Sequence, residues 1–422
     1  MTGRHAAGTA PQSPRAEIRA LTGLRAVAAT WVVLFHFTNQ LAPYLSAVPF
    51  AGQVAAAGWT GVELFFVLSG FVITRAYAEE LGRPRLRSLV RFVGGRFARV
   101  WPAWAAVTLA MAGWLWAIRE AGWAADLVNP HPAVDAPALL GQLAMTHMWG
   151  RDELAGASYV LPGWSISVEW AAYLAFPLLA LLLRPLRRLP ASVLLVLSVL
   201  AVSPLVVIAA VEGPYNSQLP WELRIACAFT AGALAALAVG RARRAAWEPF
   251  AAGAVRVIPL LVLLGILWAG WRRTMPGAGG DHVGVVVVLF PVLVAALALT
   301  ERGLAQALSG RALVFGGRIS YAVYLVHFVV LDVLLTVLWQ DPAKHNVLGP
   351  GLALAAPFLV LGCFGLAAGL HRYVEEPGRR LVVRGLDRLL PVETVADDRT
   401  GRLDLRTLPP LPAARATVGP TT

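Results

Sequence analysis

The sequence predicts an all-α polytopic membrane protein with about ten transmembrane helices and both termini in the cytoplasm. Of its 422 residues, 58% are hydrophobic and only 14% are charged, whereas a soluble domain of average composition carries about 25% charged residues. Long apolar runs recur along the chain, with short basic clusters between them. Such clusters are typical of membrane topology, so the net charge of +12 does not indicate a nucleic-acid partner.

Ten apolar runs have about the length that a helix needs to cross a bilayer. They are residues 21–40, 60–78, 100–118, 164–183, 191–211, 222–240, 255–271, 283–300, 319–339 and 350–371. We therefore expect a polar N-terminus over 1–19, a transmembrane domain over 20–382 and a cytoplasmic, disordered tail over 383–422. The expected location is a bacterial inner or plasma membrane, which the protein crosses several times.

The charges of the connecting segments support this map independently. Most of the 36 basic residues fall in the termini and in every second connection, and the segment 83–99 is the most basic. The alternate connections hold only Arg119, Arg151, Arg272, Arg273 and Lys344. Because cytoplasmic segments carry the excess of basic residues, this alternation indicates an even number of spans with both termini inside.

The longest outer connection, 119–163, contains one apolar stretch that is too short to span. Ala138–Trp149 reads ALLGQLAMTHMW and is interpreted as a re-entrant or interfacial piece. Cys227 and Cys363 both lie inside apolar runs, so no disulfide framework is expected. The sequence also shows no metal-ligand spacing.

The first apolar run, LTGLRAVAATWVVLFHFTNQ, carries Arg25 and His36. In a helix their spacing places both on one stripe, roughly 16 Å apart along the axis. A guanidinium inside the bilayer costs about 2.5–3.5 kcal/mol on insertion scales. Such a charge usually faces a cavity or a partner, although Arg25 is close enough to the helix start to snorkel to the headgroups.

Further polar side chains lie at or inside other predicted spans. They are Glu63, the pair Arg96 and Arg99 at the inner mouth of the third span, Glu169 with Ser165 before it, Arg224, and Tyr324 with His327 in the ninth span. Several have structural alternatives. Arg96 and Arg99 suit positive-inside anchors, Arg224 could pair with Glu222 or snorkel, and His327 suits a packing residue. Tyr321 and Tyr324 suit interfacial aromatics.

These residue types together suggest acid–base chemistry within the bilayer. An imidazole oriented by a carboxylate can act as a general base, which makes His36 and Glu169 candidates. Two arginines at the cytoplasmic mouth suit a phosphate-bearing ligand. Composition and spacing alone do not separate such an enzyme from a proton-coupled transporter.

At these residues the chain resembles the membrane-bound acyltransferase family 3, which contains O-antigen, Nod-factor and macrolide O-acyltransferases. The resemblance covers residues 18–382 and rests on the joint order of several motifs. They are the Arg25–His36 spacing, GVELFFVLSGF at 61–71, RFARVWPAW at 96–104, WSISVE at 164–169, GRISYAVYLVH at 317–327 and VEEPGRR at 374–380. Trp170 stands where many members have a second acidic or amide residue, and Glu63 replaces a more frequent aspartate.

The resemblance implies a ten-helix enzyme that moves an acyl group, often acetyl from acetyl-CoA, onto a carbohydrate or glycosylated hydroxyl. It implies His36 as the catalytic histidine with Arg25 and Glu169 in the catalytic site, and Arg96 and Arg99 as the residues that bind the donor. Acyl-CoA is then a co-substrate and not a bound cofactor. Glu63, Ser165, Arg224, Tyr324 and His327 are expected to support the substrate or the structure.

Two other hypotheses belong to different classes. One is a secondary transporter with His36 and Glu169 as proton carriers, against which the absence of an internal repeat argues. The other is a carrier or sensor that binds CoA without turnover. The sequence leaves open the acceptor, the acyl chain length, the side of the membrane that is modified, the oligomeric state and whether a covalent acyl-enzyme forms.

Overall fold

The computed structural model describes residues 17–82, 85–124, 127–211, 221–275, 282–338 and 350–390. Within these ranges the chain is helical and contains no strand. Its long helices are α1 (Arg19–His36), α4 (Gly61–Leu81), α5 (Leu86–Glu120), α7 (Trp164–Leu182), α8 (Ala191–Val211), α9 (Trp221–Arg241), α10 (Arg244–Arg273), α11 (Phe290–Leu299), α13 (Arg311–Leu338), α14 (Pro350–Leu370) and α15 (Glu376–Leu389).

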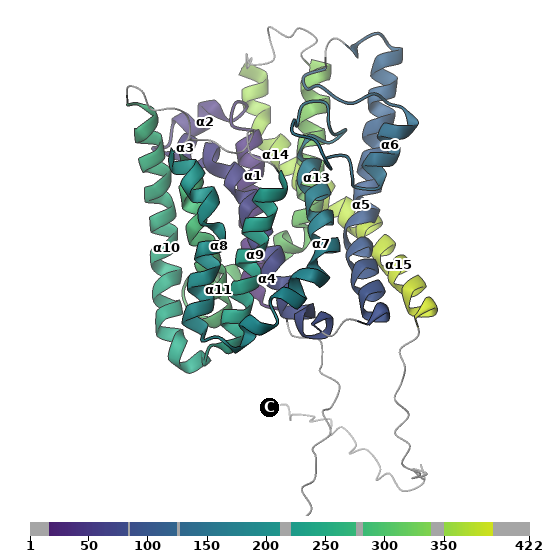
Figure 1. Ribbon diagram of the computed structural model, residues 1–422. Coiled ribbons are helices and arrows are strands. Elements are labelled where there is room, and N and C mark those ends of the chain that lie inside the picture. Colours follow the sequence, from purple (N-terminus) through teal and green to yellow (C-terminus); the bar gives the residue numbers. More distant parts are fainter. Residues whose placement is uncertain are drawn as a thin grey trace, which may run out of the picture.

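Short helices join these long ones. They are α2 (Ala42–Ser46), α3 (Ala51–Ala56), η1 (Ala57–Thr60), α6 (Ala136–Leu143), η3 (Leu161–Gly163), η4 (Pro185–Arg188), η5 (Val283–Leu289), α12 (Leu304–Leu308) and the π-helical turn η7 (His371–Glu375). The long helices run side by side in a bundle, with α10 at one edge and α5 at the other (Figure 1).

Within the described residues, eight helices are long and apolar enough to cross a membrane, and they coincide with eight of the ten predicted spans. The other two predicted spans are also helical. The 18 residues of α1 rise roughly 27 Å. The segment 283–299 starts with a 3-10 helix, whose larger rise per residue brings its length to roughly 29 Å. Both lengths approach the thickness of a hydrocarbon core. The structure therefore confirms the predicted all-α, polytopic class.

Small residues let the central helices approach closely. Gly70 of α4 lies against the backbone carbonyl of Phe229 in α9, and Gly232 of α9 lies against the carbonyl of Val67 in α4. A side chain at either glycine would meet backbone atoms. Close contact through small residues is the usual way in which membrane helices pack, because lipid tails supply little hydrophobic drive for helix association.

Large apolar side chains are exposed on the outer helices. On α10 they include Leu260 and Leu264, and on α14 they include Phe358 and Leu361. A soluble protein does not maintain such faces in water, whereas hydrocarbon solvates them. The exposed faces of α10 and α14 therefore define surfaces that contact lipid.

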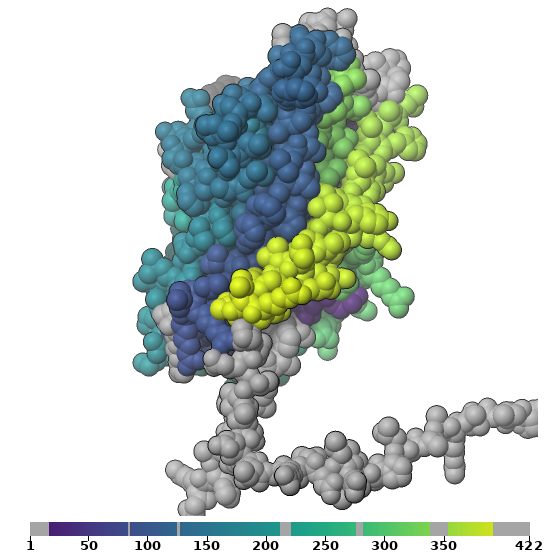
Figure 2. Space-filling view, turned by 90° about the vertical axis from the view of Figure 1, so that its right-hand side faces the viewer, coloured from purple at the N-terminus to yellow at the C-terminus, as the bar shows by residue number. Residues whose placement is uncertain are grey.

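The end of the chain folds back along α5. The π-helical turn η7 follows α14, and α15 then lies diagonally across the lower half of α5 (Figure 2). Two glycines set this contact, because Gly378 packs on Pro102 and Gly94 packs on Leu386. Since α15 reaches Leu389, the helical region extends beyond the predicted boundary at residue 382. The rest of the predicted tail, from 391, and residues 1–16 of the predicted N-terminus lie outside the described residues.

The apolar stretch of the outer connection does not span. It forms α6 and a turn that pack against α5, where the indoles of Trp101 and Trp104 donate to the carbonyls of Leu143 and Gln142. His147 stacks on Trp104, with ring centroids 5.4 Å apart. Burial lowers the pKa of His147 to about 4, although its hydrogen bond to the Gly163 carbonyl opposes the shift. A neutral histidine therefore packs this connection onto the bundle.

Replacing Gly232 by Ala should weaken the bundle. The added methyl group would overlap the Val67 carbonyl, and overpacking of this kind costs about 1–3 kcal/mol. Gly113→Ala on α5 is a matched control, because nothing lies within 4 Å of its added Cβ. Unfolding in detergent, followed by temperature or by SDS titration, should show a lower midpoint for Gly232→Ala alone. Equal midpoints for both variants would contradict the proposed close approach.

Candidate active site

A cavity of about 100 Å³ lies inside the bundle between α1, α4, α5, α7 and α13. Its lining contains three arginines, Arg25, Arg96 and Arg99, and the carboxylate of Glu169. Apolar side chains such as Phe65 complete its walls. The structure thus brings together five helices and four of the charged residues that the sequence predicted for the site.

Glu169 is held by hydroxyl groups. Its Oε1 accepts a hydrogen bond from Tyr173, one helical turn further along α7, at 2.5 Å. The same oxygen accepts a hydrogen bond from Ser69 of α4 at 2.8 Å. Arg25 and Glu169 also attract each other electrostatically across the cavity. The carboxylate therefore has fixed donors and a cationic partner, as a charge inside a membrane protein requires.

The three arginines differ in how far their hydrogen-bond donors are used. Arg96 lies over the ring of Tyr77 at 5.3 Å and donates to its hydroxyl at 3.4 Å. The buried Nε atoms of Arg25 and Arg96 have no hydrogen-bond partner within the described part of the chain. Buried donors are normally satisfied. Both arginines also line the cavity, so each brings a guanidinium whose buried Nε is not satisfied by the described residues.

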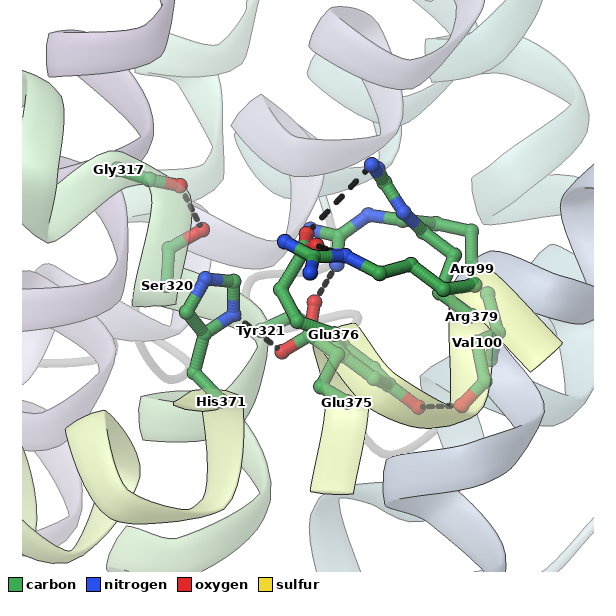
Figure 3. A network of polar contacts seen from close by, with 10 residues as sticks. Arg99, Val100, Gly317, Ser320, Tyr321, His371, Glu375, Glu376 and Arg379 are labelled. Carbon is green, nitrogen blue, oxygen red and sulfur yellow. Dashed lines mark hydrogen bonds and ion pairs between the residues drawn. The ribbon is translucent and has the colours of Figure 1, made fainter. Parts of the chain in front are cut away.

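Arg99 is anchored from outside the cavity. It forms an ion pair with Glu375 of η7 and lies over the ring of Tyr321 at 5.7 Å. His371 contacts the second carboxylate oxygen of Glu375 through Nδ1 at 3.0 Å. Figure 3 shows Arg99 from α5 meeting Glu375 and His371 from the segment between α14 and α15.

His36, at the end of α1, pairs with His327 of α13. The Nδ1 of His36 lies 3.0 Å from the Val32 carbonyl and 3.2 Å from Nε2 of His327. The Nδ1 of His327 in turn lies 3.0 Å from the Val323 carbonyl. Because carbonyls only accept, both neutral rings carry their proton on Nδ1. His327 then accepts from His36, and Nε2 of His36 keeps a lone pair without a partner among the described residues.

The histidine pair and the charged cavity are separate. Within the described residues the cavity lining includes neither histidine, and its outer end is formed by Tyr324 and Ser165. The ring of Tyr324 lies 5.8 Å from that of His327. The predicted support of His36 by Glu169 is therefore wrong as a direct contact: His36 contacts His327, and Glu169 contacts Ser69 and Tyr173. The physical reason is the helical rise, which separates the two ends of the site.

Tyr321 and Tyr324 are not interfacial aromatics, as one interpretation of the sequence suggested. Tyr321 donates to the Val100 carbonyl at 2.9 Å. The hydroxyl of Tyr324 lies 2.7 Å from Ser165 Oγ, and both hydroxyls reach the Pro162 carbonyl. These bonds tie α13 to α5 and to the start of α7. Ser165 thus bonds the backbone at the start of α7.

Glu63 and Arg224 form an ion pair inside the bundle. Two guanidinium nitrogens of Arg224 lie 2.8 and 2.6 Å from Glu63 Oε1, and both residues are at most 1% exposed. Arg224 also lies over the ring of Trp164 at 4.5 Å. Pairing of Arg224 with Glu222 is therefore wrong, because Glu222 is exposed while Glu63 of α4 is buried beside the guanidinium. The pair supports the structure.

Sequence reasoning did not assign three residues that complete the site: Ser69, Tyr173 and Glu375. Each carried a signal. Tyr173 stands four residues after Glu169, on the same helix face. Ser69 and Glu375 lie within the motifs at 61–71 and 374–380. What the sequence lacked was the helix pairing that gives each residue its partner.

A second polar cluster ties the outer connection to α13. Asp332 accepts from the side chain of Asn129 at 2.8 Å, and its other oxygen lies 2.8 Å from Nε2 of His131. The side chains of His131 and Asp332 are 1% exposed. This cluster holds the residues that follow α5 over the outer part of α13.

The fold and the site define a polytopic membrane protein with a charged cavity inside its helix bundle. The sequence model of the acyltransferase 3 family, described as "Acyltransferase domain", matches residues 18–371. The chain therefore belongs to this family and is an acyltransferase, as the motifs predicted.

Curated relatives agree with the family. The chain is 28% identical over 407 residues to the acyltransferase MdmB of Streptomyces mycarofaciens, which covers 90% of this chain and 95% of the relative. It is 26% identical over 353 residues to the O-acetyltransferase OatA of Staphylococcus aureus, covering 76% of this chain but only 51% of OatA. No solved structure matches the chain.

Loss of one partner of the Glu63–Arg224 pair should be strongly destabilising. Arg224→Met would leave the Glu63 carboxylate buried and unpaired, which costs about 3–5 kcal/mol. The double variant Glu63→Gln with Arg224→Met should recover much of that loss, and Glu222→Gln serves as the exposed control on the same helix. Unfolding midpoints of the purified proteins measure the effect. A double variant as unstable as Arg224→Met would argue against the pair.

Proposed function

We propose that this protein is a membrane O-acyltransferase that moves an acyl group, in the first instance acetyl, from acyl-CoA to a hydroxyl of a carbohydrate or glycosylated acceptor. One observation carries the proposal: Arg25 and Arg96 each keep a buried Nε without a hydrogen-bond partner among the described residues, and both side chains line a cavity with Arg99 and Glu169. Such a cavity suits an anionic ligand with several acceptor groups, and the phosphates of acyl-CoA are groups of this kind.

Arginines bind the phosphates of CoA in this proposal. Arg96 and Arg99 lie at the end of the most basic segment, 83–99, in the first half of α5, which we expect on the cytoplasmic side. CoA is a cytoplasmic donor, so it would enter from that side. Arg25 lines the same cavity from α1 and would hold the donor closer to its thioester.

His36 is proposed as the general base. Its Nδ1 proton is directed to Val32 and His327, which leaves Nε2 free to take a proton. The acceptor hydroxyl loses its proton to His36 as its oxygen attacks the thioester carbonyl. The carbon–sulfur bond then breaks, and the proton finally neutralises the CoA thiolate. The products are the ester and free CoA.

Because the cavity and the histidine pair are separate, we assign them to different substrates. Arg25 and His36 lie roughly 16 Å apart along α1, so they need not contact the same group. The arginines serve the donor and His36 serves the acceptor. Tyr324 and Ser165 stand between them at the outer end of the cavity. The thioester must therefore reach past Tyr324, or the acyl group must be relayed.

The acceptor class rests on the family and its named members. MdmB is named an acyltransferase and OatA an O-acetyltransferase, and the family acts on carbohydrates and glycosylated compounds. We place the protein in a bacterial cell membrane, in keeping with its eight candidate membrane-spanning helices.

Replacing His36 by Ala should abolish acyl transfer while the protein still inserts. Loss of a general base costs about 10²–10⁴-fold in rate. Thr38→Ala is the control, because among the described residues this neighbouring hydroxyl bonds the Leu34 and Phe35 carbonyls. Mass spectrometry of glycans and glycosylated small molecules from expressing cells, normalised to membrane protein, measures the transfer. Full acylation in the His36 variant would refute its role.

Replacing Arg96 by Gln should weaken binding of CoA. Hydrogen bonds to charged groups contribute about 1.5–3 kcal/mol, so the dissociation constant should rise about 10- to 100-fold. Arg384→Gln, exposed on α15, removes the same charge outside the cavity and should change little. Calorimetric titration of purified protein with CoA separates the two. A cavity variant that binds CoA as wild type does would exclude Arg96 from the donor site.

A further inference from the structure

Among the described residues, Glu375 is the carboxylate that forms an ion pair with an arginine of the cavity while it does not line the cavity itself. It is fully buried and belongs to the π-helical turn η7. Arg99 holds Oε1 and His371 holds Oε2. With both oxygens occupied, the carboxylate is fixed in place.

The turn that carries Glu375 is itself unusual. A π-helical turn accommodates an extra residue within a helix, and such turns occur frequently at functional sites. Here it joins α14 to α15, where α15 packs across α5 (Figures 2 and 3). Gly378 on Pro102 and Leu386 on Gly94 fix that contact. Glu375 therefore reaches Arg99 from the turn that leads into this contact.

The charges around Arg99 are unbalanced without Glu375. Arg25 and Arg96 both repel Arg99, and Glu169 is the carboxylate that lines the cavity with them. Three cations against one anion would bind a polyanion strongly. Glu375 adds a second negative charge directly behind the central guanidinium.

We propose that Glu375 is a built-in counter-anion of the donor site: it positions Arg99 and limits the affinity of the arginines for CoA, so that spent CoA leaves after transfer. This inference rests on the proposed CoA donor. Glu375 acts through Arg99 and is a positioning residue. The ligand class it tunes is a phosphorylated anion in the cavity.

Two effects of removing this charge oppose each other. Without Glu375 the Arg99 side chain loses its anchor, and the ligand must order it on binding. Ordering one side chain weakens binding by no more than about tenfold. Loss of a negative charge near a polyanion strengthens binding, and at the effective dielectric of such sites a unit charge within about 8 Å changes affinity by more than tenfold for each ligand charge. Because CoA carries several phosphate charges, the electrostatic effect wins.

The test compares Glu375→Gln with Glu376→Gln in the full-length protein. Glu376 is the adjacent residue and pairs only with Arg379 and Arg380 among the described ion pairs, so its variant controls for α15. CoA titrations and steady-state kinetics with acetyl-CoA are the readouts. We expect Glu375→Gln to bind CoA at least tenfold more tightly and to lower KM and kcat together, because product release slows. Glu375→Asp should restore wild-type behaviour.

If Glu375→Gln does not fold, the same comparison can be made in protein that also carries Arg99→Gln. Arg99→Gln alone leaves Glu375 buried and unpaired, and should bind CoA weakly. The double variant Arg99→Gln with Glu375→Gln lacks both charges, and should bind CoA at least tenfold more tightly than Arg99→Gln. Unchanged or weaker CoA binding on loss of Glu375 in the background that folds would overturn the inference.

The outcomes distinguish this inference from the proposed function. If wild-type protein does not bind CoA, or binds it without any effect of Arg96→Gln, the donor assignment itself fails. If binding depends on Arg96 and is insensitive to Glu375, the donor assignment stands and the counter-anion role is wrong. A change in stability alone, with KM and CoA affinity unchanged, assigns Glu375 a purely structural role and also overturns the inference.

Discussion

The structure depends on compensating charge within a bundle that lipid surrounds. An uncompensated arginine or glutamate in hydrocarbon is expensive, and each one here is matched in a different way. Arg224 and Glu63 neutralise each other completely inside the bundle. Arg99 has Glu375 behind it, and Glu169 has the hydroxyls of Ser69 and Tyr173.

The degree of compensation separates structure from function. In the Glu63–Arg224 pair two guanidinium nitrogens contact one carboxylate oxygen, aromatic rings lie over the guanidinium, and the pair holds α4 against α9 beside the glycine contacts of the same helices. The cavity is different, because buried nitrogens of Arg25 and Arg96 have no partner in the described residues. A protein that leaves such donors unpaired in a low-dielectric interior forgoes stability, and an anionic ligand restores it on binding. We therefore propose function at the cavity, where three arginines share the lining with one carboxylate.

The axial arrangement explains how one enzyme could handle two chemically different substrates. In the proposed reaction the donor side presents cations, and the acceptor side presents two imidazoles whose Nδ1 atoms contact backbone carbonyls. Both sides are built on the same two helices, α1 and α13, which carry Arg25 with His36 and Tyr321 with His327. Rigid helices set the distance between the two ends of the site, so the substrates must span that distance.

The sequence by itself determined the class of fold and the helical segments, and it predicted most residues of the candidate site. Apolar runs and basic clusters suffice for this, because the cost of burying charge in lipid acts on each segment separately. The joint motifs likewise identified Arg25, His36, Arg96, Arg99 and Glu169. Only the tertiary structure decided the partners: His327 for His36 in place of Glu169, Glu63 for Arg224 in place of Glu222, and Glu375 for Arg99. Those pairings depend on the rotation and crossing of helices far apart in the chain, which periodicity within a single helix does not encode.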